Sequence, residues 1–323
     1  TCSQLGFMFI AAGFSMYSLA IFHLVIHAFF KALLFLGAGS VIKSLNHQQN
    51  IKKMGKLWRK LPLTYLIMII GCLALSGTPF FSGYYSKELI VNLGLSSNLF
   101  LSKYVYLISI VVVVLTSLYS FRLIYHVFHG PLNFSITQYK TVKESSFFIL
   151  LPLILLGFFA TFSGYFFKDF FINEKYTQLW INSNVTIISN FDLHHESFFI
   201  NLIPTFSAIF GIFLVFYLYF FRNNLILFLQ KKFNSIYQFL LNKWYVDDLY
   251  NYLFVQNIIK LSDNLWKKID IGLIDRLGPN ALALSIKKIS KFFSNLQTGY
   301  IYHYVFSFII GMTLLISFII FFN

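Results

Sequence analysis

The chain has 323 residues, of which 58% are hydrophobic and 11% charged, and its mean hydropathy is +0.71. Soluble domains are about 45–50% apolar and about 25% charged. This composition excludes an ordinary soluble enzyme and predicts an integral membrane protein. In a membrane protein, the net charge of +14 bears on the orientation of the spans, because Lys and Arg concentrate in loops on the inner side of the membrane. Nucleic-acid binding is therefore not needed to explain the basic excess.

Apolar runs of spanning length predict six membrane helices, since a helix needs about 20 residues to cross a bilayer. They fall at 19–43, 62–93, 102–128, 147–168, 199–221 and 299–322, and the last of these predicts a C-terminal anchor. The first stretch, 1–14, would reach only about 21 Å as a helix, so we expect it to be part of a span. We interpret the chain as a C-terminal fragment whose N-terminal portion is a separate chain, a cleaved piece or absent from this sequence.

Charges in the loops predict the orientation of these spans. If successive spans alternate, the loops at 43–61, 129–146 and 222–298 share one side and hold 19 Lys and Arg. The loops on the other side hold Lys103, Lys168 and Lys175. We therefore expect loop 43–61 on the cytoplasmic or matrix face.

Segment 222–298 mixes apolar and charged residues at helical spacing and is not expected to span the membrane. That composition is typical of an amphipathic helix at an interface. Gly272 and Gly278-Pro279 are expected to break it. The alternative is a loose basic domain that binds lipid head groups.

The run FHLVIHAFFK places His23, His27 and Lys31 at positions i, i+4 and i+8 of the first complete span. Such residues stack on one helix face, about 6 Å apart per step. Lys31 would lie near mid-membrane, where a charge costs about 3 kcal/mol or more. Histidine titrates near neutral pH, and water can bridge groups at this spacing. The row is therefore a candidate proton relay; the alternative is a packing seam between helices.

The span at 62–93 contains Gly77, Pro79 and Gly83, which predict a helix broken at 77–83. Broken helices at membrane depth line cavities and mark ion sites in transporters. Lys87 and Glu88 follow the break and, as neighbours on a helix, point in different directions. We expect Glu88 to pair with a neighbouring helix or subunit. The alternative for Lys87 is that it extends to the membrane surface.

Motifs for redox or nucleotide chemistry are missing from the sequence. It has no GxGxxG, no P-loop and no Cys cluster, since Cys2 and Cys72 stand alone in apolar surroundings. The triplet His194-His195-Glu196 is similar to a metal-ligand cluster only superficially, and a solvated loop is expected there. The sequence therefore predicts no cofactor and no metal in this chain.

Five runs of sequence carry a specific resemblance. They are TCSQLGFMF at 1–9, AIFHLVIHAFFKALLFLGAGSVIKSLNHQQNIKKMGKLWRKLPLTY at 20–65, SGTPFFSGYYSKELI at 76–90, TSLYSFRLIYHVFHG at 116–130 and WYVDDLYNYLFV at 244–255. Together they closely resemble the C-terminal part of the subunit 5 family of respiratory complex I, the NADH–ubiquinone oxidoreductase. The similarity extends over the whole chain.

That resemblance implies an antiporter-like proton pump at the distal end of the complex I membrane arm, built from inverted repeats that each contain a broken helix. It implies that His23, His27 and Lys31 are the central relay and that Lys87 is the terminal lysine near the exit. Glu88 stands where the family usually has Asp. The family's lysine and glutamate of the first half are absent here, so half of the pump would lie on another polypeptide.

The resemblance also implies partners and a location. Segment 222–298 would be the family's lateral helix, which runs along the neighbouring antiporter-like subunits and contacts membrane lipids. NADH, FMN, Fe–S clusters and ubiquinone would be bound by other subunits. The expected location is the mitochondrial inner membrane, or else a bacterial or plastid energy-transducing membrane. Two alternative functions remain: a subunit of a multisubunit monovalent-cation/proton antiporter, and a non-pumping clamp of the membrane arm.

Overall fold

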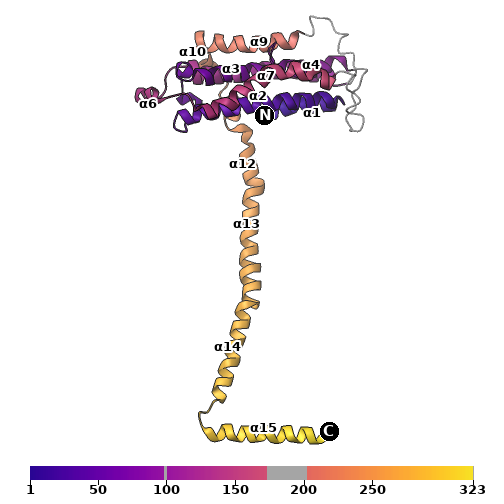
Figure 1. Ribbon diagram of the computed structural model, residues 1–323, viewed down its shortest axis with the longest axis vertical. Coiled ribbons are helices and arrows are strands. Elements are labelled where there is room, and N and C mark those ends of the chain that lie inside the picture. Colours follow the sequence, from indigo (N-terminus) through magenta and orange to yellow (C-terminus); the bar gives the residue numbers. More distant parts are fainter. Residues whose placement is uncertain (98–99, 173–201, 323) are drawn as a thin grey trace. The chain divides into compact units, whose positions relative to one another are not determined.

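The computed structural model describes residues 1–97, 100–172 and 202–322, and every regular element in these ranges is a helix. The chain divides into two units, Thr1–Leu229 and Gln230–Asn323. In the first unit, apolar helices lie side by side in a bundle (Figure 1). They are α1 (Cys2–Gly13), α2 (Tyr17–Ser44), α3 (Pro62–Ser76), α4 (Ser82–Ser96), α5 (Ser102–Ile124), α7 (Phe147–Ile172) and α9 (Ile203–Phe216).

Five helices of the described ranges are long and apolar enough to cross a membrane. They are Tyr17–Ser44, Ser102–His129, Phe147–Ile172, Ile203–Phe221 and Ile301–Phe321. The shortest has 19 residues and reaches about 28 Å, close to the thickness of the hydrocarbon core. The predicted class, an all-α integral membrane protein, is confirmed. The second predicted span, 62–93, is divided into the pair α3 and α4, each of 15 residues.

Helices α1 and α2 form an antiparallel hairpin. The turn Phe14–Met16 joins them, with Ser15 in a left-handed conformation and the Met16 amide bonded to the Ala11 carbonyl at 2.9 Å. One face of α1 is buried, and its residues are Gln4, Phe7, Met8 and Ala11. Helix α2 contacts α1, α3, α4 and α7, so it is the central helix of the bundle.

The break between α3 and α4 spans residues 77–81. Gly77 ends α3 with a φ of +80°, a conformation that glycine adopts without strain, and the Thr78 amide bonds back to the Leu73 carbonyl. Pro79 and Phe80 follow, and α4 begins at Ser82. The sequence predicts a break that extends to Gly83, but in the structure Gly83 belongs to the first turn of α4.

Gly83 allows the two half-helices to approach each other closely. A Cβ atom at this position would lie 1.8 Å from the Ala74 carbonyl oxygen of α3. In the same turn of α4, the Ser82 hydroxyl donates to the Ala160 carbonyl of α7 at 2.5 Å. These contacts fix the start of α4 between α3 and α7.

Glu144, in the loop before α7, caps the start of α3. Its carboxylate accepts hydrogen bonds from the amides of Leu63 and Thr64, at 3.2 and 3.4 Å, and from the Thr64 hydroxyl. The first amides of a helix have no partners within the helix, and a negative charge near them is favourable. Ser40 of α2 bonds both Thr64 and Ser145, which ties α2 to the same corner.

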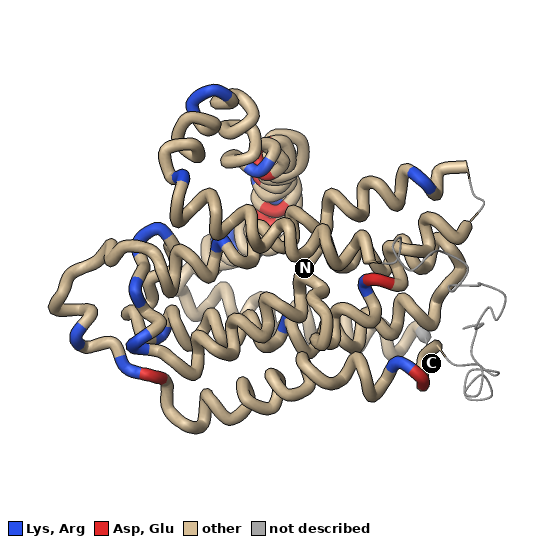
Figure 2. The backbone as a smooth tube through the Cα atoms, turned by 90° about the horizontal axis from the view of Figure 1, so that it is seen from above, with Lys and Arg blue, Asp and Glu red and all other residues tan. Residues whose placement is uncertain are grey.

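Lys and Arg gather at the end of the bundle that carries α6 (Ile136–Thr141), as Figure 2 shows. The loop between α2 and α3 contributes exposed cations there, namely Lys52, Lys53, Lys56 and Arg59. The far end has Lys103 in the first turn of α5 and Lys168 in the last turns of α7. Two of the loops that the sequence placed on one side of the membrane, 43–61 and 129–146, therefore lie at one end of the bundle.

The second unit contains a helix that runs from Val246 to Leu277. It includes α12 (Val246–Tyr250), α13 (Gln256–Leu265) and the π-helical stretches Asn251–Val255 and Trp266–Asp275. Gly278, next to Pro279, ends it, as expected. The expected break at Gly272 was wrong: this residue lies inside a π-helical stretch, and a helix tolerates an interior glycine at a cost of about 1 kcal/mol.

This helix is amphipathic. In α13, Ile258, Leu261 and Leu265 share one face, and Lys260 and Asp263 lie on the opposite face. Other α-helices of the described residues are α10 (Asn223–Lys232), α11 (Asn234–Leu241), α14 (Pro279–Leu296) and α15 (Ile301–Phe322). The placement of the amphipathic helix along neighbouring subunits remains a prediction.

Candidate functional site

The predicted row on α2 lies inside the bundle. His23 is fully buried, His27 is 7% exposed and Lys31 is half-buried. The imidazole centroids of His23 and His27 are 6.2 Å apart, close to the rise of one helical turn. Lys31 is near the middle of the 28-residue helix, and its ammonium lies 6.0 Å from the ring of Phe35.

Helix α4 brings Lys87 to the other end of this row. The neighbouring residue Ser86 places its hydroxyl 2.8 Å from His23 Nδ1. Lys87 is 3% exposed, and its ammonium donates to the carbonyls of Leu75 and Ser76 at 3.3 Å each. These carbonyls belong to the last turn of α3, which is the negative end of that helix. The break in the helix therefore creates the binding site for the Lys87 ammonium.

Two aromatic side chains enclose the row. The Phe7 ring of α1 is 6.4 Å from the His23 ring and 5.4 Å from the Lys87 ammonium, which lies over its face. The Phe30 ring of α2 is 5.4 Å from the His27 ring, edge to face. Both rings are buried. They keep the histidines in a compact, mostly apolar setting.

Glu88 does not join the row. Its half-buried side chain shares a hydrogen bond with Tyr84 and lies in the field of Lys168 of α7. The sequence-based expectation that Lys87 and Glu88 point in different directions therefore describes the structure. Four of the five candidate residues come together, in the order Lys31, His27, His23, Lys87.

Sequence reasoning missed Ser86 and Phe7. Ser86 is bonded to His23 across 63 positions of the sequence, and Phe7 lies between His23 and Lys87. Serine next to a lysine and phenylalanine in an apolar helix are both common, so neither carries a signal until the helices are packed. The triplet His194-His195-Glu196 lies outside the described residues.

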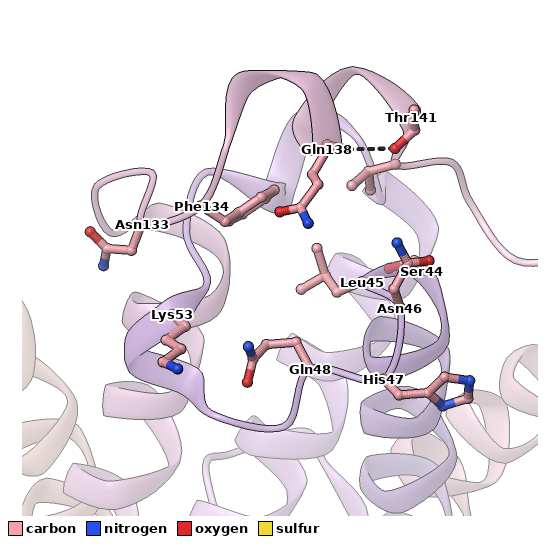
Figure 3. A pocket seen from close by; sticks show the side chains of 11 residues that line it. Ser44, Leu45, Asn46, His47, Gln48, Lys53, Asn133, Phe134, Gln138 and Thr141 are labelled. Carbon is pink, nitrogen blue, oxygen red and sulfur yellow. Dashed lines mark hydrogen bonds between the residues drawn. The ribbon is translucent and has the colours of Figure 1, made fainter.

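A separate pocket lies among the loops at the basic end of the bundle (Figure 3). Its volume is about 300 Å³, and Ser44, Gln48, Lys53 and Gln138 contribute polar side chains to its lining. None of the row residues lines it. The pocket is therefore distinct from the buried row.

The described helices form a multi-spanning membrane bundle, and a family match places it in the antiporter-like class. Residues 1–116 match the family of NADH:quinone oxidoreductase and Mrp antiporter transmembrane segments. Residues 119–319 match the C-terminal family of NADH dehydrogenase subunit 5. The chain belongs to the NADH dehydrogenase subunit 5 family, which confirms the resemblance seen in the sequence.

Curated relatives agree with this assignment. The chain is 42% identical to NADH-ubiquinone oxidoreductase chain 5 of Acanthamoeba castellanii, over 98% of its own length and 48% of the relative. It is 37% identical to the same chain of Marchantia polymorpha, over 98% of this chain and 48% of the relative. It is 40% identical to that of Phytophthora infestans, over 94% of this chain and 46% of the relative. The chain therefore spans about half the length of the curated relatives it matches.

Proposed function

We propose that this chain forms part of the proton-translocating path of respiratory complex I, coupled to NADH:ubiquinone electron transfer on other subunits. The observation that carries the proposal is the row of Lys31, His27, His23 and Lys87 beside a broken helix, in which the two histidines and Lys87 are buried and Lys31 is half-buried. Ionisable groups at membrane depth are costly and mark ion pathways. A purely structural bundle would not need four of them in line.

Each residue of the row has a role in this path. A proton passes between Lys31 and His27, then to His23, and leaves through Lys87. The carbonyls of Leu75 and Ser76 hold the Lys87 ammonium when it is charged. Glu88 lies beside the path, toward Lys168 and the end of the bundle opposite the basic loops, and there it takes protons leaving the row.

The other parts of the proposal concern partners. The redox cofactors are bound by other subunits, and this chain supplies proton transfer alone. The curated relatives are about twice as long as the stretch matched here, and the N-terminal portion of subunit 5 contributes the rest of the pump. The amphipathic helix contacts the neighbouring antiporter-like subunits and lipids through the face that carries Ile258, Leu261 and Leu265.

The Mrp antiporter is the second candidate, because residues 1–116 match a family that includes both kinds of protein. The match of residues 119–319 to subunit 5 of NADH dehydrogenase favours complex I. Purification decides between the two: the complex I assignment requires that this chain co-purifies with NADH oxidation activity.

Lys87→Met is expected to lower proton uptake per NADH oxidised, because the row loses its last proton carrier. The carbonyls of Leu75 and Ser76 would also lose a donor, at a cost of about 1–3 kcal/mol. The measurement is proton uptake and NADH oxidation in vesicles that contain the complex, with assembly checked on native gels. Lys103→Met is the matched control, since Lys103 is exposed at the start of α5. An unchanged ratio of proton uptake to NADH oxidation in Lys87→Met would refute the proposal.

We also propose that the chain resides in the mitochondrial inner membrane with loop 43–61 in the matrix, as the loop charges suggest. A membrane-impermeant amine reagent is then expected to label Lys56 in inside-out particles and Lys103 in mitoplasts; both side chains are exposed in this chain. Mass spectrometry identifies the labelled lysines. The reverse pattern would invert the topology.

A further inference from the structure

Gln4 of α1 is a polar side chain buried in an apolar helix face. It is fully buried, and neither of its amide atoms has a hydrogen-bond partner among the described residues. An amide left in this state destabilises the fold, and buried polar groups normally have a partner. A protein that keeps such a group inside a membrane bundle requires something else to satisfy it.

The hairpin geometry places Gln4 beside the row. Phe7 lies opposite His23, with 6.4 Å between the ring centroids. Because α1 and α2 are antiparallel and rise equally per residue, Gln4, three residues before Phe7, is level with Ile26, three residues after His23. His27 is the next residue of α2. The unpartnered amide is therefore at the level of the middle of the row.

The histidines present unpartnered atoms as well. The Nε2 atoms of both His23 and His27 are buried and have no hydrogen-bond partner among the described residues. Water satisfies buried polar groups when two to four of them surround a site. The Gln4 amide has both a donor and an acceptor, and the two Nε2 atoms add one hydrogen-bonding position each.

We propose that Gln4 is a positioning residue of the proton path: its amide holds water against the free Nε2 atoms of His27 and His23, and this water carries protons along the row. The inference rests on the function proposed above. In each transfer one group loses a proton and the lone pair of the next group gains it. The amide of Gln4 neither gains nor loses a proton, because it acts by orienting the water.

Two substitutions separate this role from a packing role. Gln4→Met keeps the length of the side chain and leaves no room or partner for water, so proton uptake is expected to slow roughly tenfold, equivalent to about 1.4 kcal/mol on the barrier. Gln4→Ala leaves space that water can enter, so its proton uptake is expected to exceed that of Gln4→Met. Heat stability of the complex should rank the other way, because truncation opens a cavity.

The measurements are proton uptake, NADH oxidation and thermal inactivation of the assembled complex in vesicles, with Gln4→Leu as a second apolar variant should Gln4→Met not assemble. Uptake in D₂O is measured too, and a larger isotope effect in the apolar variant is expected. Normal proton uptake in Gln4→Met (or in Gln4→Leu, if that variant replaces it) overturns the inference. Slower proton uptake in Gln4→Ala than in that apolar variant overturns it too. Lys31→Ala in the same preparation tests the proposed function itself: if it impairs uptake while the apolar variant does not, this inference alone fails.

Discussion

Gly83→Ala is expected to prevent assembly of the subunit, the largest structural effect that we anticipate. The new Cβ would lie 1.8 Å from the Ala74 carbonyl oxygen and 2.9 Å from the carbonyl carbon. These are backbone atoms of α3, so they cannot rotate aside as a flexible side chain would. The half-helices must separate, and Lys87 would then lose its contacts with Leu75 and Ser76.

Gly157→Ala is the matched control. This glycine is buried in α7, and a Cβ atom there would meet nothing within 4 Å. Alanine in a helix interior is favoured over glycine by about 0.5–1 kcal/mol, so this variant should assemble normally. Native gels and thermal inactivation measure both variants. Normal amounts of a stable Gly83→Ala complex would show that the contact between α3 and α4 is looser than the structure has it.

Lys31→Ala is expected to give the largest loss of proton translocation in a complex that still assembles. Lys31 is half-buried near the middle of α2, one turn beyond His27, and removing it interrupts the row at one end. Since the side chain has some exposure, its truncation should leave packing largely intact. The expected result is a lower proton uptake per NADH oxidised in vesicles, at normal abundance of the complex on native gels.

Lys43→Ala is the control for that experiment, because it removes the same charge from an exposed position in the last turn of the same helix. The neighbouring Phe30 does not serve this purpose. It is 1% exposed and packs against His27 at 5.4 Å, so Phe30→Ala would open a cavity at a cost of about 3–5 kcal/mol. If Lys31→Ala and Lys43→Ala take up the same number of protons per NADH oxidised, the row has no role in proton transfer. That result would favour the alternative of a non-pumping clamp of the membrane arm.

Features of single helices could be predicted from the periodicity and the length of apolar runs in the sequence. The spacing of His23, His27 and Lys31 fixes their common face once a helix forms, and the apolar run around them is long enough for that helix to cross the membrane. Gly77 and Pro79 likewise announce a break, since one favours a left-handed conformation and the other lacks an amide hydrogen.

Contacts between helices could not be predicted in the same way. The bond between Ser86 and His23 depends on how α4 rotates against α2, and the position of Lys87 depends on how far the break turns the chain. Gly272 shows that a residue pattern can also predict a break that does not form. Glycine permits a break in a helix but does not impose one, and the amphipathic helix continues through Gly272. The burial of Gln4 is equally invisible in a stretch that is otherwise a plain apolar helix.

Helix α3 has a charged side chain at each end. The Glu144 carboxylate binds the amides at its start, and the Lys87 ammonium binds the carbonyls at its finish. The helix is thus a polarised rod of 15 residues, about 22 Å long, held between opposite charges that each suit the end they touch. Neutralising Lys87 would remove the positive charge from the carbonyl end of α3 and leave the Glu144 carboxylate at its amide end. The charge on Lys87 therefore acts on the last turn of α3, and the charge on Glu144 acts on its first turn, at the basic end of the bundle.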